Sequence, residues 1–96
     1  MLYLVLAHDF DDDDAATRRG RVRQAHLDGV QPLADAGTLQ MGGAFLDDDG
    51  TMRGSLMLIE ADDAAAVRDI VLNDVYVRER VWDPDRIEIR PFRRAV

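Results

Sequence analysis

The sequence predicts a single α+β domain with the element order βαββαβ and a four-stranded antiparallel sheet. Three observations carry this prediction: alternating apolar residues near both ends, an Asp-Gly hairpin signal near the middle, and two segments with helical spacing between the strands. A chain of 96 residues with 47% hydrophobic and 32% charged content is long enough for one core and too short for two. We therefore expect one domain over residues 1–96.

The first strand is expected from Leu2 to His8, where apolar side chains fall on both faces, as they do in a buried strand. An acidic cluster from Asp9 to Asp14 follows the strand. Within it, Asp11 to Asp14 is expected to form a loop and to cap the next helix, because carboxylates favour the free N–H groups of a helix N-terminus. The helix is expected from Ala15 to Ala36, with Gly37 as its stop. Its apolar positions recur at helical spacing and are Val22, Val30 and Leu33.

A β-hairpin is expected in the middle of the chain. The segments Thr38 to Leu46 and Thr51 to Glu60 both have strand character, and they flank the connection Asp47 to Gly50. The Asp-Gly pair at the end of this connection supplies the positive backbone angles that a tight hairpin requires. We therefore expect the two strands to pair in antiparallel fashion.

The remainder of the chain is expected to add a helix and a last strand. Asp62 and Asp63 precede this helix as caps, and the helix has one apolar stripe. The less regular segment Asn73 to Trp82 indicates a short further helix. Asp83 to Asp85 is expected to turn into a final strand from Arg86 to Phe92. The apolar stripe of the helix consists of Val67, Ile70 and Val71.

This element order with right-handed crossovers predicts the ferredoxin-like arrangement, in which both helices cover one face of the sheet. The first strand leaves apolar residues on the other face as well, and a second copy of the chain is the simplest cover for them. A chain of this length buries only about 60–68% of its unfolded surface, so association adds stability. We expect a homodimer.

Composition excludes several classes of function. A formal net charge of −7 disfavours nucleic acid and anionic membrane surfaces as partners. The longest apolar run is far shorter than a membrane span and no basic segment precedes it, so we expect a cytoplasmic protein. The absence of lysine excludes Schiff-base chemistry, and the absence of cysteine excludes thiolate nucleophiles and thiolate metal sites.

His26 is the most informative candidate for acid–base chemistry. At about 100° per residue it falls in the middle of the apolar stripe of the first helix, so its ring is expected to point toward the sheet. A buried imidazole needs a hydrogen-bond partner, and that partner decides whether the ring is neutral or charged. One interpretation is a core histidine bonded to a main-chain carbonyl. The other is a general acid or base oriented by a carboxylate.

Two aspartates are candidates for orienting His26. Asp35 lies on the opposite side of the same helix and about 13 Å along its axis, so direct contact is not expected. Asp74 falls within the apolar stripe of the second helix if that helix extends so far, and it then faces inward. The alternative for Asp74 is a cap on the next short turn through Tyr76.

Few other side chains are available for chemistry, because Ser55 is the only serine. It either donates a hydrogen bond to a substrate oxygen or occupies a strand edge. His8 and Asp9 are interpreted mainly as an exposed pair in an acidic loop. The acidic runs lack the spacing of a calcium loop, and Gly42 and Gly43 occur without the rest of a phosphate-binding motif. We therefore expect neither a metal nor a cofactor.

Several short motifs together resemble the YciI-like family over nearly the whole chain. Their order and spacing carry the resemblance, and they are Met1-Leu2-Tyr3, Arg21 to Leu27, Asp35-Ala36-Gly37, Gly42, Gly54-Ser55, Asn73 to Tyr76 and Arg90-Pro91-Phe92. The fold of that family is a ferredoxin-like dimer, a dimeric α/β barrel related to muconolactone isomerase. The resemblance therefore implies the fold and the dimer that the sequence pattern also predicts.

The resemblance further implies a site. The family carries a histidine and aspartate pair in a cleft, and one member acts as a dehydrochlorinase in chloroaromatic breakdown. His26 matches the histidine, and Asp74 matches the aspartate of the family's Asp-Pro-Tyr motif. Val75 replaces the proline of that motif, which changes the turn that aims the carboxylate.

Two hypotheses for function follow. In the first, His26 is a general acid or base, Asp74 fixes its tautomer, and the protein isomerises or eliminates from a small cyclic or aromatic substrate without a cofactor. Ser55, Arg19 and Tyr76 are then the candidate substrate-binding residues. In the second hypothesis, the domain is a non-catalytic dimer that binds a small ligand or a protein partner, and the histidine serves packing.

Overall fold

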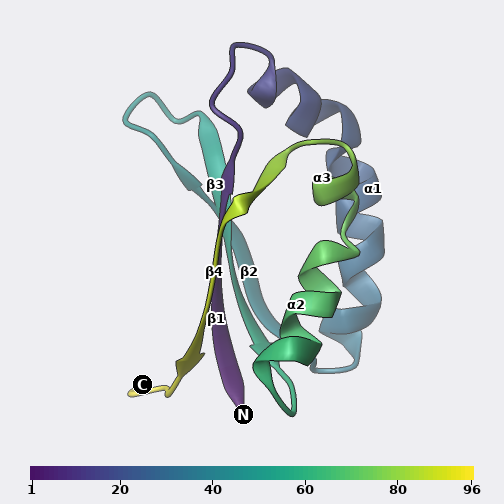
Figure 1. Cartoon of the computed structure of the whole chain (residues 1–96), viewed down its shortest axis with the longest axis vertical. Coiled ribbons are helices and arrows are strands. Elements are labelled where there is room, and N and C mark those ends of the chain that lie inside the picture. The colour runs from purple at the N-terminus through teal and green to yellow at the C-terminus, as the bar shows by residue number, and fades with distance from the viewer.

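In the computed structural model, which describes residues 1–96, four antiparallel strands form one sheet, and every helix lies on the same face of it (Figure 1). The strands are β1 (Leu2–Asp9), β2 (Leu39–Leu46), β3 (Met52–Glu60) and β4 (Trp82–Phe92). The helices are α1 (Ala15–Asp35), α2 (Ala64–Leu72) and α3 (Val75–Arg78). The strand order β2-β3-β1-β4 is that of a ferredoxin-like fold, which confirms the predicted fold class.

β1 lies between β3 and β4, and its side chains alternate between the two faces of the sheet. Tyr3, Val5 and Ala7 are buried under the helices, whereas the residues between them are half-buried on the other face. Val5 pairs with Met57 of β3 on one side and with Ile89 of β4 on the other. The helix-covered face of the sheet is therefore built around β1.

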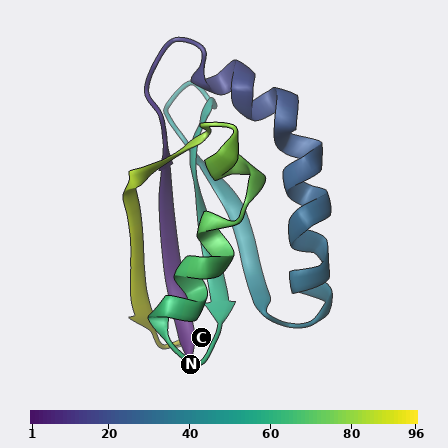
Figure 2. The ribbon, with the colours of Figure 1, turned by 45° about the vertical axis from the view of Figure 1, so that its right-hand side comes forward.

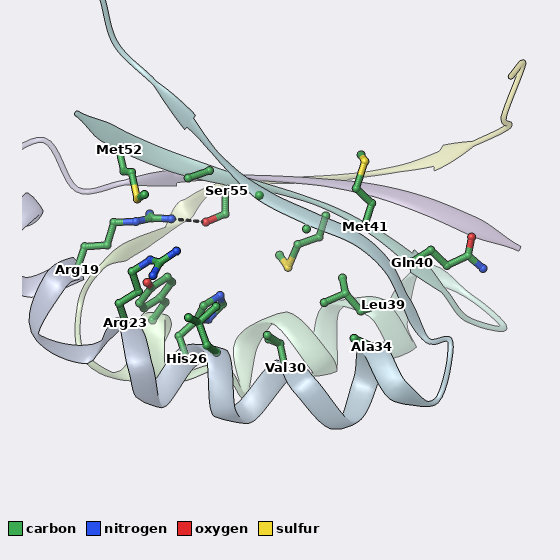
Figure 3. A pocket seen from close by; sticks show the side chains of 16 residues that line it. Arg19, Arg23, His26, Val30, Ala34, Leu39, Gln40, Met41, Met52 and Ser55 are labelled. Carbon is green, nitrogen blue, oxygen red and sulfur yellow. Dashed lines mark hydrogen bonds between the residues drawn. The ribbon is translucent and has the colours of Figure 1, made fainter. Parts of the chain in front are cut away.

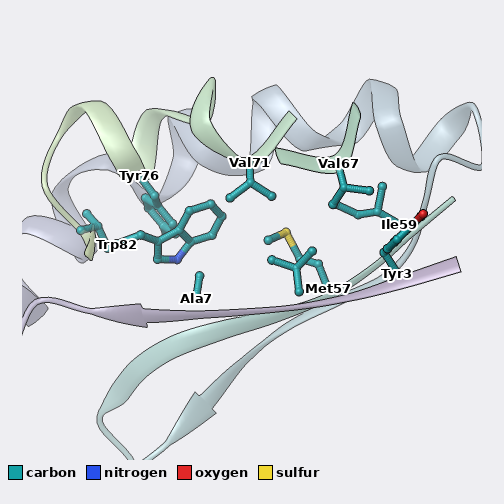
Figure 4. Packing of buried hydrophobic residues seen from close by; sticks show 10 residues of the cluster. Tyr3, Ala7, Met57, Ile59, Val67, Val71, Tyr76 and Trp82 are labelled. Atoms are coloured by element: carbon teal, nitrogen blue, oxygen red, sulfur yellow. The ribbon is translucent and has the colours of Figure 1, made fainter. Parts of the chain in front are cut away.

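The core lies between this face and α2, with Trp82 and Tyr76 closing one end (Figure 4). Val67 and Val71 of α2 point down onto the sheet, as their spacing predicts. α1 contacts this cluster through Val22 and through His26, which stacks on Tyr76, and Figure 2 shows the helix beside β2. The buried cluster consists of Tyr3, Val5, Ala7, Met57, Ile59, Val67, Val71, Tyr76, Val81 and Trp82.

The helix ends are only partly as expected. Asp63 caps α2, because its side chain accepts the backbone N–H of Ala66 at 2.8 Å. The cap predicted for α1 is wrong, since Asp14 stands at the N-cap position without a side-chain hydrogen bond. The carboxylate of Asp12 forms a hydrogen bond within the loop instead, in which it accepts the backbone N–H of Asp14 at 3.0 Å. The acidic segment before α1 is thus a loop stabilised from within.

The last strand begins earlier than expected. β4 starts at Trp82, which pairs with Asp9 beyond a shift in register, so the segment Asp83 to Asp85 belongs to the strand and the predicted turn there is wrong. Pro84 is tolerated because β4 is a sheet edge, where one N–H needs no ladder partner. The side chain of Asp83 accepts the backbone N–H of Asp85 at 3.0 Å, which is the local turn signal that the sequence carries.

The second face of the sheet carries no helix (Figure 1). It presents the half-buried leucines of β1 and the exposed side chains of Met41 and Phe92. Gly54 of β3 lies here directly beneath the ring of Phe45, and a Cβ at this position would also be 2.6 Å from the carbonyl oxygen of Ala7. Only glycine fits such a close approach.

None of the three helices combines the length and the apolar character that a bilayer crossing requires.

Candidate active site

A cavity of about 380 Å³ lies between α1 and the strands β2 and β3 (Figure 3). Arg19, His26 and Val30 rise from α1 toward the sheet, and Ser55 points down from β3 (Figure 3). One wall is apolar, and the polar groups gather at the end near Ser55. The lining residues are Arg19, Arg23, His26, Leu27, Val30, Ala34, Leu39, Gln40, Met41, Gly42, Gly43, Ala44, Met52, Ser55, Met57 and Tyr76.

His26 borders this cavity and contacts Asp74. The Nδ1 atom of His26 lies 2.9 Å from Oδ1 of Asp74, and the two side chains are only 12% and 10% exposed. In the neutral form of the ring, a carboxylate at this distance accepts the hydrogen bond of Nδ1–H, which leaves the lone pair on Nε2. Nε2 makes no hydrogen bond within the chain. The ring is thus bonded to a carboxylate, as one of the two interpretations of the sequence requires.

Asp74 lies behind the ring as seen from the cavity. His26 borders both this cavity and a second hollow of about 360 Å³ between α1 and the segment from α2 to α3, whereas Asp74 borders only the second one. The carboxylate therefore supports the imidazole from the side that faces away from the cavity. Such an arrangement leaves the imidazole, not the acid, in contact with a bound molecule.

The local structure around Asp74 combines the two alternatives that the sequence left open. α2 ends at Leu72, so the second helix does not extend as far as Asp74. Asp74 is instead the N-cap of α3, where its Oδ1 accepts the backbone N–H of Tyr76 at 2.8 Å. The same oxygen contacts His26. The cap therefore orients the carboxylate toward the imidazole although Val75 stands at the next position.

Tyr76 packs flat against His26, with ring centroids 3.9 Å apart. The indole of Trp82 meets both rings edge-on, at 5.5 Å from His26 and 5.4 Å from Tyr76. Burial raises the pKa of the Tyr76 phenol above its usual value, and the nearby guanidinium groups of Arg19 and Arg23 offset part of the rise. The rings of Tyr76 and Trp82 thus hold the imidazole in one orientation.

A buried ion pair forms the other polar group of the cavity. Nη1 of Arg19 donates to both carboxylate oxygens of Asp9 at 2.8 and 2.9 Å, and the two residues are 5% and 3% exposed. Nη2 of Arg19 donates to Oγ of Ser55 at 2.9 Å, and Nε1 of Trp82 donates to the same oxygen at 3.0 Å. Burial raises the pKa of Asp9, although the contact with Arg19 opposes this shift.

Two expectations about these residues are wrong. Asp9 is not an exposed partner of His8, because strand β1 continues through Asp9 and turns the two side chains to opposite faces of the sheet. The His8 ring instead meets the edge of Phe45 at 5.2 Å on the helix-free face. Ser55 does not occupy a strand edge, since β3 is paired on both sides.

Sequence reasoning missed the Asp9–Arg19 pair, although two signals point to it. Asp9 continues the alternation of the buried residues Tyr3, Val5 and Ala7. Arg19 precedes His26 by two helical turns, so it falls on the same face of α1. An acid in register with a buried strand face and an arginine in an apolar stripe are expected to pair, because each is costly to bury alone.

The remaining charged candidates lie away from the bonded groups. Arg23 is exposed at the cavity and has no carboxylate partner within the chain. Arg18 pairs with Asp12 on the surface at 2.7 Å. Asp35 accepts a hydrogen bond from Gln31 and does not reach His26. No group of three or more His, Asp or Glu side chains lies close enough together to hold a metal ion.

The chain matches the YCII-related domain over residues 1–93. It belongs to the YCII-related family. The resemblance to YciI-like proteins that the sequence motifs suggest is thereby confirmed. Among YCII-related structures, the chain is similar to a 5-chloro-2-hydroxyhydroquinone dehydrochlorinase, TftG, from Burkholderia phenoliruptrix AC1100, which was solved in complex with 2,5-dihydroxybenzoquinone. The two chains are 26% identical with a TM-score of 0.80, and the likeness covers 97% of this chain and 94% of the dehydrochlorinase.

Two fungal proteins extend the comparison of this YCII-related chain. Fusaric acid biosynthesis protein 2 of Gibberella moniliformis is 29% identical over 97 residues, which cover 95% of this chain and 91% of that protein. Aspartate kinase FUB3 of Fusarium oxysporum f. sp. lycopersici is 29% identical over 99 residues, or 97% of this chain. The match spans only 18% of the length of that kinase.

Proposed function

We propose that this YCII-related protein is a cofactor-independent acid–base enzyme in which His26 moves a proton on a small cyclic or aromatic substrate. The observation that carries the proposal is the 2.9 Å contact between His26 Nδ1 and Asp74, which leaves the lone pair of Nε2 free beside a cavity. A base with its second nitrogen bonded to a carboxylate is held in the basic tautomer. The proposed reaction is an isomerisation or an elimination.

The proposed step begins with proton abstraction by Nε2 of His26 from a carbon or hydroxyl of the bound ring. Asp74 stabilises the imidazolium that forms, and the stacked ring of Tyr76 keeps it in place. In an isomerisation the imidazolium returns the proton to another atom of the substrate. In an elimination the electron pair of the broken bond forms a new double bond, chloride leaves, and the proton passes to water. Neither outcome needs an oxidant or a reductant.

The size and polarity of the cavity support a ring as the substrate. A volume of about 380 Å³ is in the range of sites for small molecules, and its apolar wall suits the faces of a ring. Ser55, Arg19 and Tyr76 are the proposed substrate-binding residues. The similar dehydrochlorinase TftG acts on a chlorinated hydroquinone and binds a dihydroxybenzoquinone, and both are rings of this size.

A non-catalytic role is the second candidate. The segment similar to this chain in aspartate kinase FUB3 is a small part of a much longer protein, which favours a module that binds a ligand or a partner. In that role the cavity binds a small molecule without converting it. The exposed apolar residues on the helix-free face favour a homodimer under either candidate, and a cytoplasmic location stays a prediction from the sequence.

Chloride release distinguishes the two candidates. The purified protein is incubated with 5-chloro-2-hydroxyhydroquinone, and with an unsaturated cyclic lactone as a second substrate, while chloride and ultraviolet absorbance are followed. The acid–base proposal expects turnover that His26→Gln lowers by at least about a hundredfold. The matched control is His8→Gln on the opposite face of the sheet, which keeps wild-type turnover. Turnover that survives His26→Gln contradicts the proposed base, and binding without turnover favours the second candidate.

A further inference from the structure

Ser55 has an unusual set of hydrogen bonds at the cavity. The residue is 4% exposed, and its Oγ accepts from Nη2 of Arg19 at 2.9 Å and from Nε1 of Trp82 at 3.0 Å. A guanidinium and an indole N–H act only as donors, so neither bond can run in the opposite direction. Both lone pairs of the hydroxyl oxygen are therefore occupied.

The hydroxyl hydrogen is the one hydrogen-bonding group of Ser55 that remains. It has no acceptor within the chain, although a buried donor without a partner costs free energy. Ser55 borders the cavity, whereas Trp82 does not. The hydroxyl hydrogen of Ser55 can therefore point into the cavity, where a bound molecule can accept it. An atom of a bound molecule that comes within reach must accept, because the oxygen has no lone pair left to receive a donor.

We propose that Ser55 is a specificity-determining residue that selects ligands with an acceptor oxygen, such as a ring carbonyl or a phenolate, and rejects those with an N–H donor at that position. The proposal rests on the proposed function only in that both use the same cavity. It also assigns Ser55 a role other than nucleophile, since an attacking oxygen needs a free lone pair.

The charges around Ser55 support an oxygen of high electron density as its partner. The guanidinium of Arg19 polarises the hydroxyl through its hydrogen bond, which strengthens the hydroxyl as a donor. The carboxylate of Asp9 accepts two hydrogen bonds from Arg19, whose guanidinium lies between this carboxylate and the Ser55 hydroxyl. During proton abstraction by His26 next to a carbonyl, negative charge would develop on this acceptor oxygen, where the donor stabilises it.

Two fluorinated rings of the same shape test the proposal. Pentafluorophenolate presents an acceptor oxygen at mildly alkaline pH, whereas pentafluoroaniline presents N–H donors. Fluorine NMR titration gives the Kd of each probe for the wild-type protein and for Ser55→Ala. We expect the wild type to prefer the phenolate by about tenfold or more, and the substitution to remove most of that preference by weakening the phenolate alone.

Three further variants make the outcome decisive. Ser55→Thr keeps a hydroxyl and is expected to keep the preference. Trp82→Phe frees one lone pair of Ser55, so it is expected to bind pentafluoroaniline more tightly than the wild type does, and it provides the test if Ser55→Ala does not fold. His26→Gln lacks the proposed base and is expected to keep the dependence on Ser55.

A phenolate preference that survives Ser55→Ala overturns the proposal, and so does an unchanged affinity of Trp82→Phe for pentafluoroaniline. Failure of the His26–Asp74 proposal has a different signature. In that case turnover survives His26→Gln while the phenolate preference still depends on Ser55.

Discussion

The imidazole of His26 lies on the ring of Tyr76 with the two planes only 5° from parallel. The backbone N–H of Tyr76 also donates to the carboxylate oxygen of Asp74 that contacts His26. Tyr76 therefore acts on the imidazole twice, once through its ring and once through its main chain. This makes it a positioning residue for the proposed base in addition to a lining residue of the cavity.

Replacement of Tyr76 by Leu or Phe separates these roles. Tyr76→Phe keeps the stacked ring, so we expect kcat within about twofold of the wild type and any loss of substrate contact to appear in KM. Tyr76→Leu removes the stack and is expected to lower kcat by about tenfold or more, because the base is no longer held in line. Steady-state kinetics check both variants, and an equal loss of kcat in both would argue against a positioning role for the ring.

Substitutions at Asp74 separate its capping role from its role toward His26. Asp74→Asn still caps α3, because asparagine caps as well as aspartate, so we expect little change in the free energy of unfolding. It removes the charge that stabilises the imidazolium, and kcat is expected to fall by about 10²–10⁴-fold. Asp74→Ala is expected to lose activity similarly and about 1 kcal/mol of stability as well. Urea denaturation and turnover measure the two effects, and wild-type kcat in Asp74→Asn would exclude the carboxylate from the mechanism.

The buried pair of Asp9 and Arg19 is expected to matter more for stability than any surface pair. Arg19→Met leaves the Asp9 carboxylate buried without its partner, which is expected to cost about 3–5 kcal/mol in the free energy of unfolding. Burial raises the pKa of Asp9 in the folded state, so the folded protein binds the proton more readily than the unfolded one. Stability of Arg19→Met is therefore expected to recover as pH falls and to decline as pH rises.

Denaturation of the double variant Asp9→Asn with Arg19→Met provides the control for this pair. It buries no charge, so it is expected to be more stable than Arg19→Met alone and to lose the dependence on pH. A single variant that unfolds like the wild type would show that the pair contributes little.

Asp12 is expected to show the opposite dependence on pH. Two hydrogen bonds from Arg18, each 2.7 Å, lower the pKa of Asp12 to about 2. The pKa of Asp12 is lower in the folded state than in the unfolded state. The pair therefore stabilises the fold at pH values above the ordinary pKa of an aspartate, and this stabilisation is lost as pH falls toward about 2. Thermal melts of the wild type and Asp12→Asn should therefore differ at mildly acidic pH and converge near the acid limit. The difference is expected to be small, since the pair is exposed, and a constant difference at every pH would contradict this assignment.

Gly54 is expected to tolerate no side chain. In Gly54→Ala the new Cβ would lie 2.6 Å from the carbonyl oxygen of Ala7 and would overlap the ring of Phe45. We expect a loss of about 1–3 kcal/mol in the free energy of unfolding. Gly43→Ala is the matched control on the neighbouring strand, because a Cβ there meets nothing within 4 Å. Equal melting temperatures for the two variants would contradict the close approach.

The fold could be predicted where the signals are local. The hairpin follows from a connection that ends in Asp-Gly, and Gly50 has the positive φ of 85° that this pattern requires. The start of β4 could not be predicted in this way. Trp82 joins the sheet because it pairs with Asp9, far away in the sequence, and this contact overrides the turn signal of the three residues that follow it.

The candidate site also contains some residues whose placement follows from local sequence patterns and others whose placement depends on contacts between distant parts of the chain. His26 interrupts the apolar stripe of α1, so its inward direction can be inferred from spacing alone. The direction of Asp74 could not be inferred in this way, because α2 ends at Leu72 and the N-cap of α3 aims the carboxylate. The burial of Asp9 was missed, although the residue continues the alternation of the buried positions of β1, because it opens an acidic run that resembles a solvated loop. A carboxylate enters the core only because Arg19 comes from α1 to neutralise it, and the alternation of β1 and the spacing of α1 give the faces of the two residues without showing that they meet.

The cavity is lined on one side by β2 and on the other by α1, and the two sides contribute different kinds of residue. The strand β2 contributes only apolar residues, glycines and one amide to the wall, and none of its side chains is hydrogen-bonded to His26 or Asp74. A side chain at Gly42, which pairs with Met57 on the helix-covered face and whose Cβ would be in ordinary contact with Leu39 at 3.7 Å, would narrow the cavity from the β2 side. Under the proposed function, β2 sets part of the ligand size while α1 and α3 carry the proposed acid–base pair, so substitutions on β2 could alter one without the other.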